Sequence, residues 1–244
     1  VPPGTAHFLE HIVHERTEKY ESRQALMKKI ELKGGSRNAT TYTAEKMDFF
    51  ATVLKEEAED AAEYVSQITA HAILTDEATE KHRSIITQEC MSRMKDPSIK
   101  AWSAFKKVIF GGTGYEFRSL GTLESIAMIS RDDMQKIYDN RFKAEHSVLS
   151  IYGDIDVKHA TELAEKYFLS MKSSDPQAGF AYESVPAAEE RGRDLTKKFE
   201  FVEIPEEQAV AFYGGSMPGR SDKSMFAISL LMQMLAGDFS SILY

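Results

Sequence analysis

Helical periodicity is the feature that most constrains the fold of this 244-residue chain. Apolar residues recur at intervals of three and four positions, which favours amphipathic helices. The pattern predicts helices over about 5–12, 22–32, 56–72, 76–95, 99–110, 130–142, 157–171 and 222–236. Shorter alternating or β-branched stretches predict strands at 36–43, 47–54, 146–152, 197–203 and 209–213. This mixture favours an α+β fold in which a mixed or antiparallel sheet packs against helices.

The segment from about 173 to 193 differs from the rest of the chain in composition. It is rich in Ser, Pro, Ala, Gly and acidic residues, which is typical of a linker. We therefore expect one domain over 1–190 and the beginning of a second over 194–244. Because residue 1 is Val and the last residues directly follow an apolar helical run, we also expect a fragment truncated at both ends.

The composition excludes several classes of protein. With 42% hydrophobic and 28% charged residues, the chain has the balance of a soluble globular protein. A net charge of −8 argues against nucleic acid as a partner, because binding a phosphate backbone needs a positive face. No run of 18 apolar residues is present, so no membrane span is expected. The single cysteine, Cys90, cannot form an internal disulfide and is expected to be a small buried residue. The composition does not distinguish between the bacterial cytoplasm, the periplasm and an organelle as the cellular compartment.

The segment His7-Phe8-Leu9-Glu10-His11 carries the strongest chemical signal. On a helix, residues four apart share a face, so the imidazoles of His7 and His11 can bind one metal ion. Glu10 lies near that face, close enough to act on a metal-bound water. This HxxEH order is the zincin motif in reverse. The five residues alone are equally compatible with an ordinary pair of surface or core histidines.

A catalytic zinc site needs a third protein ligand and an open position for water. Glu89 is the candidate, because it lies in the predicted helix 76–95 on a face shared with apolar residues. A carboxylate on such a face is costly unless a metal or a cation compensates it. The alternative is a solvated glutamate at the edge of the apolar face.

Further motifs follow in order along the chain. They are Gly4-x-Ala6 before the HxxEH, Thr17 and Tyr20 after it, Gly34-Gly35-x-x-Asn38-Ala39-x-Thr41, Leu120-Gly121-Thr122-x-Glu124-x-Ile126 and Gly153-Asp154-Ile155-Asp156. With these motifs the chain resembles the pitrilysin/insulinase family of zinc metallopeptidases, the inverzincins that include the mitochondrial processing peptidase. The 77 residues between His11 and Glu89 are similar to the spacing of the third ligand in that family.

The resemblance implies a specific site and activity. One Zn²⁺ would be held by His7, His11 and Glu89, with Glu10 as the general base of a zinc-dependent endopeptidase. Asn38, Ala39, Thr40 and Thr41 would form the edge strand on which an extended or unfolded peptide substrate is laid as an added strand. The implied fold is the metalloendopeptidase half of the family. The implied partner is a second family half or a homo- or heterodimer subunit.

The chain also departs from the family. His82 stands where the family usually has a glutamate, seven residues before the third ligand, and could be a donor to a ligand, a competing ligand or a sign of relaxed constraint. His14 lies three residues after His11 and is expected to be exposed. The family's opening strands and its downstream Arg and Tyr are absent from this sequence. The alternatives are therefore a catalytically silent processing-peptidase-like subunit that acts as a structural partner, and a structural zinc site in an unrelated protein.

Overall fold

A computed structural model describes residues 1–42, 46–111, 115–116, 118–173, 199–204, 209–215, 217–219 and 222–242. The α-helices of these ranges are α1 (Thr5–Ile12), α2 (Arg23–Glu31), α3 (Ala58–Ala70), α4 (Asp76–Arg93), α5 (Pro97–Phe110), α6 (Leu123–Met128), α7 (Arg131–Arg141), α8 (Val157–Phe168) and α9 (Met225–Ala236). Two strands, β1 (Ser36–Thr41) and β2 (Met47–Thr52), and two 3₁₀ turns, η1 (Lys55–Glu57) and η2 (Ala144–His146), complete the described elements. The chain divides into a unit over Val1–Val210 and a unit over Ala211–Tyr244.

The first unit has the α+β character that the sequence predicts. Its described sheet is a purely antiparallel hairpin, with β1 and β2 paired from Ser36 opposite Thr52 to Thr41 opposite Met47. Phe49 and Ala51 alternate along β2 and pack against the core, whereas Phe50 between them is exposed. This period of two explains why the strand is recognisable in the sequence.

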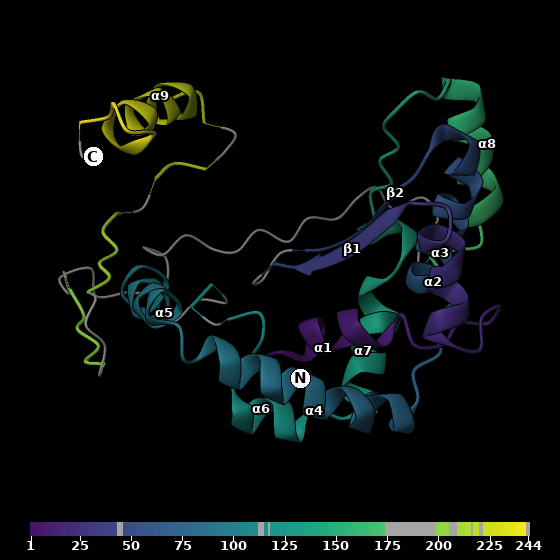
Figure 1. The fold of residues 1–244 in the computed structure, drawn as a ribbon, viewed down its shortest axis with the longest axis horizontal. Helices are drawn as coiled ribbons and strands as arrows, with labels where there is room; N and C mark the ends of the chain where they lie inside the picture. Colours follow the sequence, from purple (N-terminus) through teal and green to yellow (C-terminus); the bar gives the residue numbers. More distant parts are fainter. Residues whose placement is uncertain are drawn as a thin grey trace. The chain divides into compact units, whose positions relative to one another are not determined.

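Helix α1 lies between the hairpin and α4, as Figure 1 shows, and it also packs against α7. Its Phe8, Leu9 and Ile12 are completely buried. The helical period leaves His7, Glu10 and His11 on the remaining surface of α1, outside the apolar face. The short helix is therefore held in place by its apolar face, while its polar face stays available for chemistry.

Helix α4 is 18 residues long and begins where the sequence predicts, because the Thr75 hydroxyl accepts a hydrogen bond from the Ala78 N–H. Ile86 and Cys90 are buried on its core-facing side. The buried Cys90 agrees with the expectation for a lone cysteine. Contact between α1 and α4 brings the two predicted parts of the metal site together.

A loop before α6 fixes the start of α1. Gly121 has φ +77°, and a Cβ atom added there would lie 2.5 Å from the carbonyl oxygen of Pro3. A Cβ atom added at Gly4, with φ +93°, would lie 2.7 Å from the carbonyl oxygen of Leu120. The two backbone segments thus approach each other at a distance that only glycine permits, which accounts for both glycines of the sequence motifs.

Several expected elements are wrong. Residues 147–152 form no strand; η2 precedes them, and Val148 and Tyr152 are exposed. Residues 199–203 and 209–213 are also irregular, and 197–198 lie outside the described residues. A strand forms only when a neighbouring strand pairs with its backbone, and these segments pair with no described strand. Conversely, α6 was not expected; a capping box between Thr122 and Ser125 starts it.

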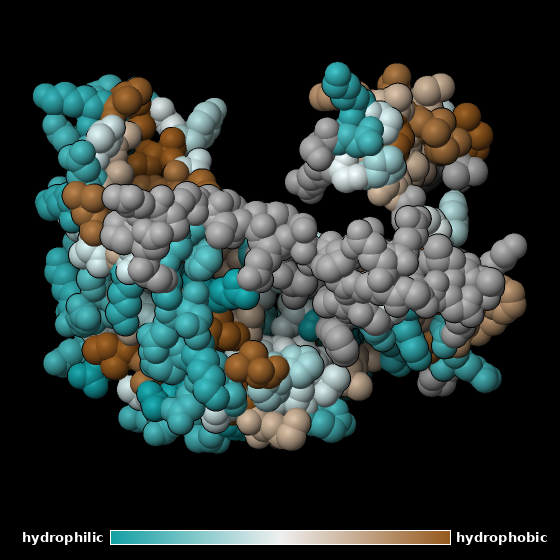
Figure 2. Space-filling view, turned by 180° about the vertical axis from the view of Figure 1, so that it is seen from behind, coloured by the Kyte–Doolittle hydropathy of each residue, from teal (hydrophilic) through white to brown (hydrophobic). Residues whose placement is uncertain are grey.

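The predicted linker at 173–193 lies, except for residue 173, outside the described residues, so the domain boundaries 1–190 and 194–244 remain predictions. In the second unit, α9 has no buried residue, and Figure 2 shows hydrophobic side chains on its surface. No helix in the described ranges combines the length and the apolar character needed to cross a membrane.

Candidate metal centre

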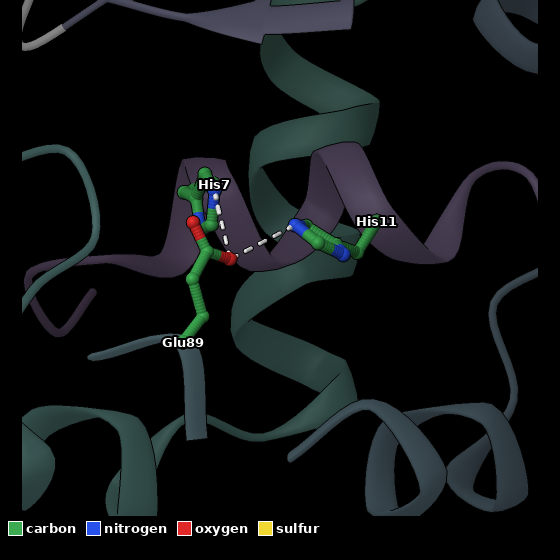
Figure 3. A group of neighbouring side chains, drawn as sticks. All are labelled: His7, His11 and Glu89. Carbon is green, nitrogen blue, oxygen red and sulfur yellow. Dashed lines mark ion pairs between the residues drawn. The ribbon is translucent and has the colours of Figure 1, made fainter. Parts of the chain in front are cut away.

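Three predicted ligands meet at the contact between α1 and α4. His7 and His11 project side by side from α1, with ring centroids 4.7 Å apart, and Glu89 points towards them from α4 (Figure 3). Glu89 Oε2 lies 3.9 Å from His7 Nε2 and 3.7 Å from His11 Nε2. One ligand atom from each residue can be chosen so that all lie within 4.8 Å of one another. The structure thus assembles the two-imidazole, one-carboxylate set from residues far apart in sequence.

The electrostatics of the cluster favour metal binding. The side chain of His7 is 12% exposed and that of His11 24%. Burial lowers the pKa of His7, and burial together with the neighbouring His7 and His82 lowers the pKa of His11 to about 3. Both imidazoles are therefore neutral at pH 7, and their nitrogen lone pairs are available to a cation. Two neutral imidazoles and a carboxylate fit Zn²⁺, which takes this donor set in catalytic sites.

The second oxygen of Glu89 has a different partner. Glu89 Oε1 lies 3.0 Å from the Arg93 guanidinium, one helical turn further along α4. This ion pair orients the carboxylate so that Oε2 faces the two imidazoles. Glu89 is consequently neither a buried unpaired charge nor a freely solvated side chain.

Glu10, the predicted general base, is bound to a residue of the hairpin. The Thr41 hydroxyl at the end of β1 donates a hydrogen bond to Glu10 Oε2. The family resemblance implied that Thr41 belongs to a substrate-binding strand, and the sequence gave no sign of this contact with Glu10, because 31 positions separate the two residues. Thr41 restricts one carboxylate oxygen of Glu10 and leaves the other without a protein partner among the contacts of the described residues.

Two histidines near the cluster are buried. His14 is 6% exposed, and its Nδ1 lies 2.8 Å from the Glu10 carbonyl oxygen, so the expectation of an exposed His14 is wrong. Burial lowers the pKa of His14 to about 4. Its ring packs near Phe49 and Tyr64, because it lies on the side of the turn after α1 that faces the core. His82 is 2% exposed, and its Nε2 lies 2.8 Å from Glu15 Oε1.

Strand β1 carries the predicted peptide-binding residues Asn38, Ala39, Thr40 and Thr41. Asn38 is exposed, and its side-chain oxygen accepts a hydrogen bond from the Ala39 N–H at 2.9 Å. β1 pairs with β2 alone among the described strands, so no described strand occupies its other edge.

Family models match two parts of the chain. Residues 2–102 match the model described as Insulinase (Peptidase family M16), and residues 128–244 match the model described as Peptidase M16 inactive domain. The first match contains the HxxEH segment and Glu89. The chain therefore belongs to the insulinase family of peptidases, family M16, as its motifs predict.

Individual relatives agree with this assignment. An uncharacterized zinc protease from Mycobacterium leprae is 26% identical over 242 residues, which cover 99% of this chain and 53% of that protein. The mitochondrial-processing peptidase subunit beta of Lentinula edodes is 30% identical over 256 residues, which cover 98% of this chain and 54% of the subunit. The chain thus spans about half the length of the curated relatives it matches.

The fold also has a solved counterpart. A peptidase M16 inactive domain from Pseudomonas fluorescens superposes with a TM-score of 0.72 at 17% identity, covering 98% of this chain and 56% of that one. At this identity the likeness establishes the fold alone. It confirms the predicted metalloendopeptidase-type architecture.

Proposed function

We propose that this chain is the zinc-binding part of a metalloendopeptidase that hydrolyses extended or unfolded peptides. His7, His11 and Glu89 hold one Zn²⁺, and Glu10 is the general base. The single observation that carries the proposal is the convergence of two neutral imidazoles and an oriented carboxylate at the contact of α1 with α4. Zinc proteases among the relatives support the choice of metal.

A bound zinc ion supplies Lewis acidity, which polarises a peptide carbonyl and makes a water molecule more acidic. The residues of this chain supply the proton transfer and the orientation of the base. The carboxylate of Glu10 takes the proton of the attacking water and gives it to the amine that leaves. The Thr41 hydroxyl holds one oxygen of Glu10, so the other oxygen is presented for proton transfer.

The edge of β1 that pairs with no described strand is suited to hold the peptide. An extended chain that adds to this edge pairs with backbone groups of residues 38–41, and such pairing recognises peptides with little regard to sequence. The Ala39 N–H, now bound by the side chain of Asn38, would exchange that partner for the substrate backbone. Because β1 ends at Thr41, a peptide on this edge is directed towards Glu10.

A two-part measurement tests the function. Zinc content is measured for the full chain and for Glu10→Gln, and hydrolysis of a quenched unstructured peptide is followed for both. We expect one zinc per chain in each protein and a loss of roughly 10²–10⁴-fold in hydrolysis for Glu10→Gln, because a general base contributes about that factor. Equal hydrolysis by both zinc-loaded proteins would exclude Glu10 as the base.

A second candidate is a catalytically silent subunit that supports an active partner. The match of residues 128–244 to a model described as an inactive domain favours it, as does His82 in place of a glutamate. Zinc binding without hydrolysis, in the presence of a second family half, would select this alternative. One relative is named as a subunit of the mitochondrial processing peptidase, and we infer that this chain also pairs with a second family half or with a dimer partner.

A further inference from the structure

The contact between α1 and α4 continues past the metal-binding cluster. Glu15 lies in the turn that follows α1, four residues after His11, and His82 lies two helical turns before Glu89 on α4. His82 Nε2 and Glu15 Oε1 are 2.8 Å apart. Two neighbouring contacts therefore join the same pair of segments, one at the metal cluster and one between Glu15 and His82.

The hydrogen bond to Glu15 determines which ring nitrogen of His82 carries a hydrogen. A carboxylate oxygen can only accept, so Nε2 of His82 carries the hydrogen and donates it to Glu15. The side chain of His82 is 2% exposed and that of Glu15 11%. Nδ1 of His82 is buried and has no hydrogen-bond partner among the described residues. Glu15 is therefore the partner that holds this buried ring in one orientation.

The ring of His82 in turn contacts the ring of His11. Their centroids are 5.7 Å apart and the planes meet at 63°, an edge-to-face arrangement. Glu89 also lies next to His11, with its Oε2 3.7 Å from His11 Nε2. His11 thus lies between a carboxylate that points at its ligand nitrogen and an imidazole that is anchored by Glu15.

We propose that Glu15 and His82 form a positioning pair for His11, which holds that ring at the angle zinc binding needs. The inference rests on the proposed zinc site and extends it to two residues that are not ligands. Outer-shell groups that orient a metal ligand typically contribute about 10–100-fold to metal affinity, and because His82 contacts His11 by its ring and not by a hydrogen bond, we expect the lower end of that range. His82 acts through ring contact and Glu15 acts through His82.

The test measures zinc affinity of the full chain by competition with a chromogenic chelator. His82→Leu removes both the donor to Glu15 and the planar group that contacts the His11 ring, whereas His82→Gln keeps a planar amide that can donate to Glu15 and pack against that ring. We expect a loss of about 10-fold for His82→Leu and a loss of only a few-fold for His82→Gln. Glu15→Ala removes the acceptor from the other side, and we expect it to match His82→Leu. If His82→Leu does not fold, Glu15→Ala tests the proposal in its place.

A matched control is Lys81→Met, because Lys81 also contacts Glu15, at 2.6 Å, and is 57% exposed. We expect its zinc affinity to equal that of the unchanged chain. Unfolding midpoints of the metal-free proteins show whether a loss reflects general instability. Equal zinc affinity of the Leu and Gln variants at position 82 would overturn the positioning pair, as would an equal loss in Lys81→Met. If the unchanged chain binds no zinc, the proposed function itself fails, which is a different result from zinc binding that is insensitive to position 82.

Discussion

The hydroxyl group of Thr41 shows how a single side chain acquires a role from packing. It lies at the end of β1, and its donor bond to Glu10 connects the hairpin with the helix that carries both histidines. The HxxEH spacing predicts that Glu10 is the general base, because this motif on a helix has a fixed geometry. The partner of Glu10 depends on how the hairpin lies over α1, which no local pattern encodes.

We expect Thr41→Val to lower the turnover number by about 10-fold while leaving zinc content unchanged. The substitution keeps the β-branched shape and removes a hydrogen bond to a charged group, which is worth about 1.5–3 kcal/mol. The measurement is kcat on the quenched peptide, together with zinc content. Thr52→Val, an exposed threonine of β2 that has no contact with Glu10, is the control. A turnover number equal to that of the control would show that Thr41 does not orient the base.

At the scale of elements, α2 and α3 are joined by a cluster of opposite charges. Glu63 of α3 is 4% exposed, accepts a hydrogen bond from the Tyr20 hydroxyl at 2.6 Å and pairs with Lys29 of α2 at 3.0 Å. Burial alone would raise the pKa of Glu63, but hydrogen bonds from Lys19, Tyr20 and Lys29 hold it below the usual value. The helices are therefore held by a carboxylate that must be ionised.

Because the pKa of Glu63 is lower in the folded state, its contribution to stability is present above about pH 4.5 and is lost as the pH falls below that value. We expect Glu63→Gln to reduce the free energy of unfolding at pH 7 by about 2 kcal/mol. The difference in unfolding free energy between Glu63→Gln and the unchanged chain is expected to become smaller in acid. Urea unfolding of the two proteins at pH 7 and at pH 3.5 measures this difference at each pH. Glu56→Gln, an exposed position in η1, is the control, and a pH-independent difference for Glu63→Gln would contradict the assignment.

The loop before α6 is the element that anchors the start of α1, so its glycine is expected to be irreplaceable. Gly121→Ala meets both a positive φ and the Pro3 carbonyl, and we expect a loss of about 2–4 kcal/mol in the free energy of unfolding. Gly34→Ala is a matched control, because Gly34 has φ +75° but open space around it. The control is expected to lose only about 1 kcal/mol. Equal losses would mean that the contact with Pro3 contributes nothing.

At the scale of the whole molecule, helix α9 of the second unit carries large apolar side chains that are exposed. Phe226, Leu230 and Met234 follow one another at intervals of four on one face of α9 and are 86%, 64% and 56% exposed. A contiguous apolar face of this kind is typical of an interaction surface.

We expect the chain to bind the dye ANS at neutral pH and the double variant Leu230→Gln, Met234→Gln to bind less. The change replaces two adjacent apolar side chains on the exposed face of α9 with polar ones of similar size. Leu32→Gln is the control, because Leu32 is 79% exposed but belongs to the first unit and not to α9. ANS fluorescence measures the effect. Unchanged fluorescence in the double variant would show that α9 does not provide the apolar surface.

The sequence by itself determined most helices and the hairpin through their periodicity, the resemblance to the family through its ordered motifs, and the candidate ligands His7, His11 and Glu89 through the HxxEH spacing and that resemblance. It did not determine which strands form, since 147–152 has the composition of a strand and no described partner to pair with. Only the tertiary structure decided that Thr41 binds Glu10, that His14 is buried and that Glu15 holds His82. Those contacts join segments that are remote in sequence, and their geometry arises when α1 is packed between the hairpin and α4.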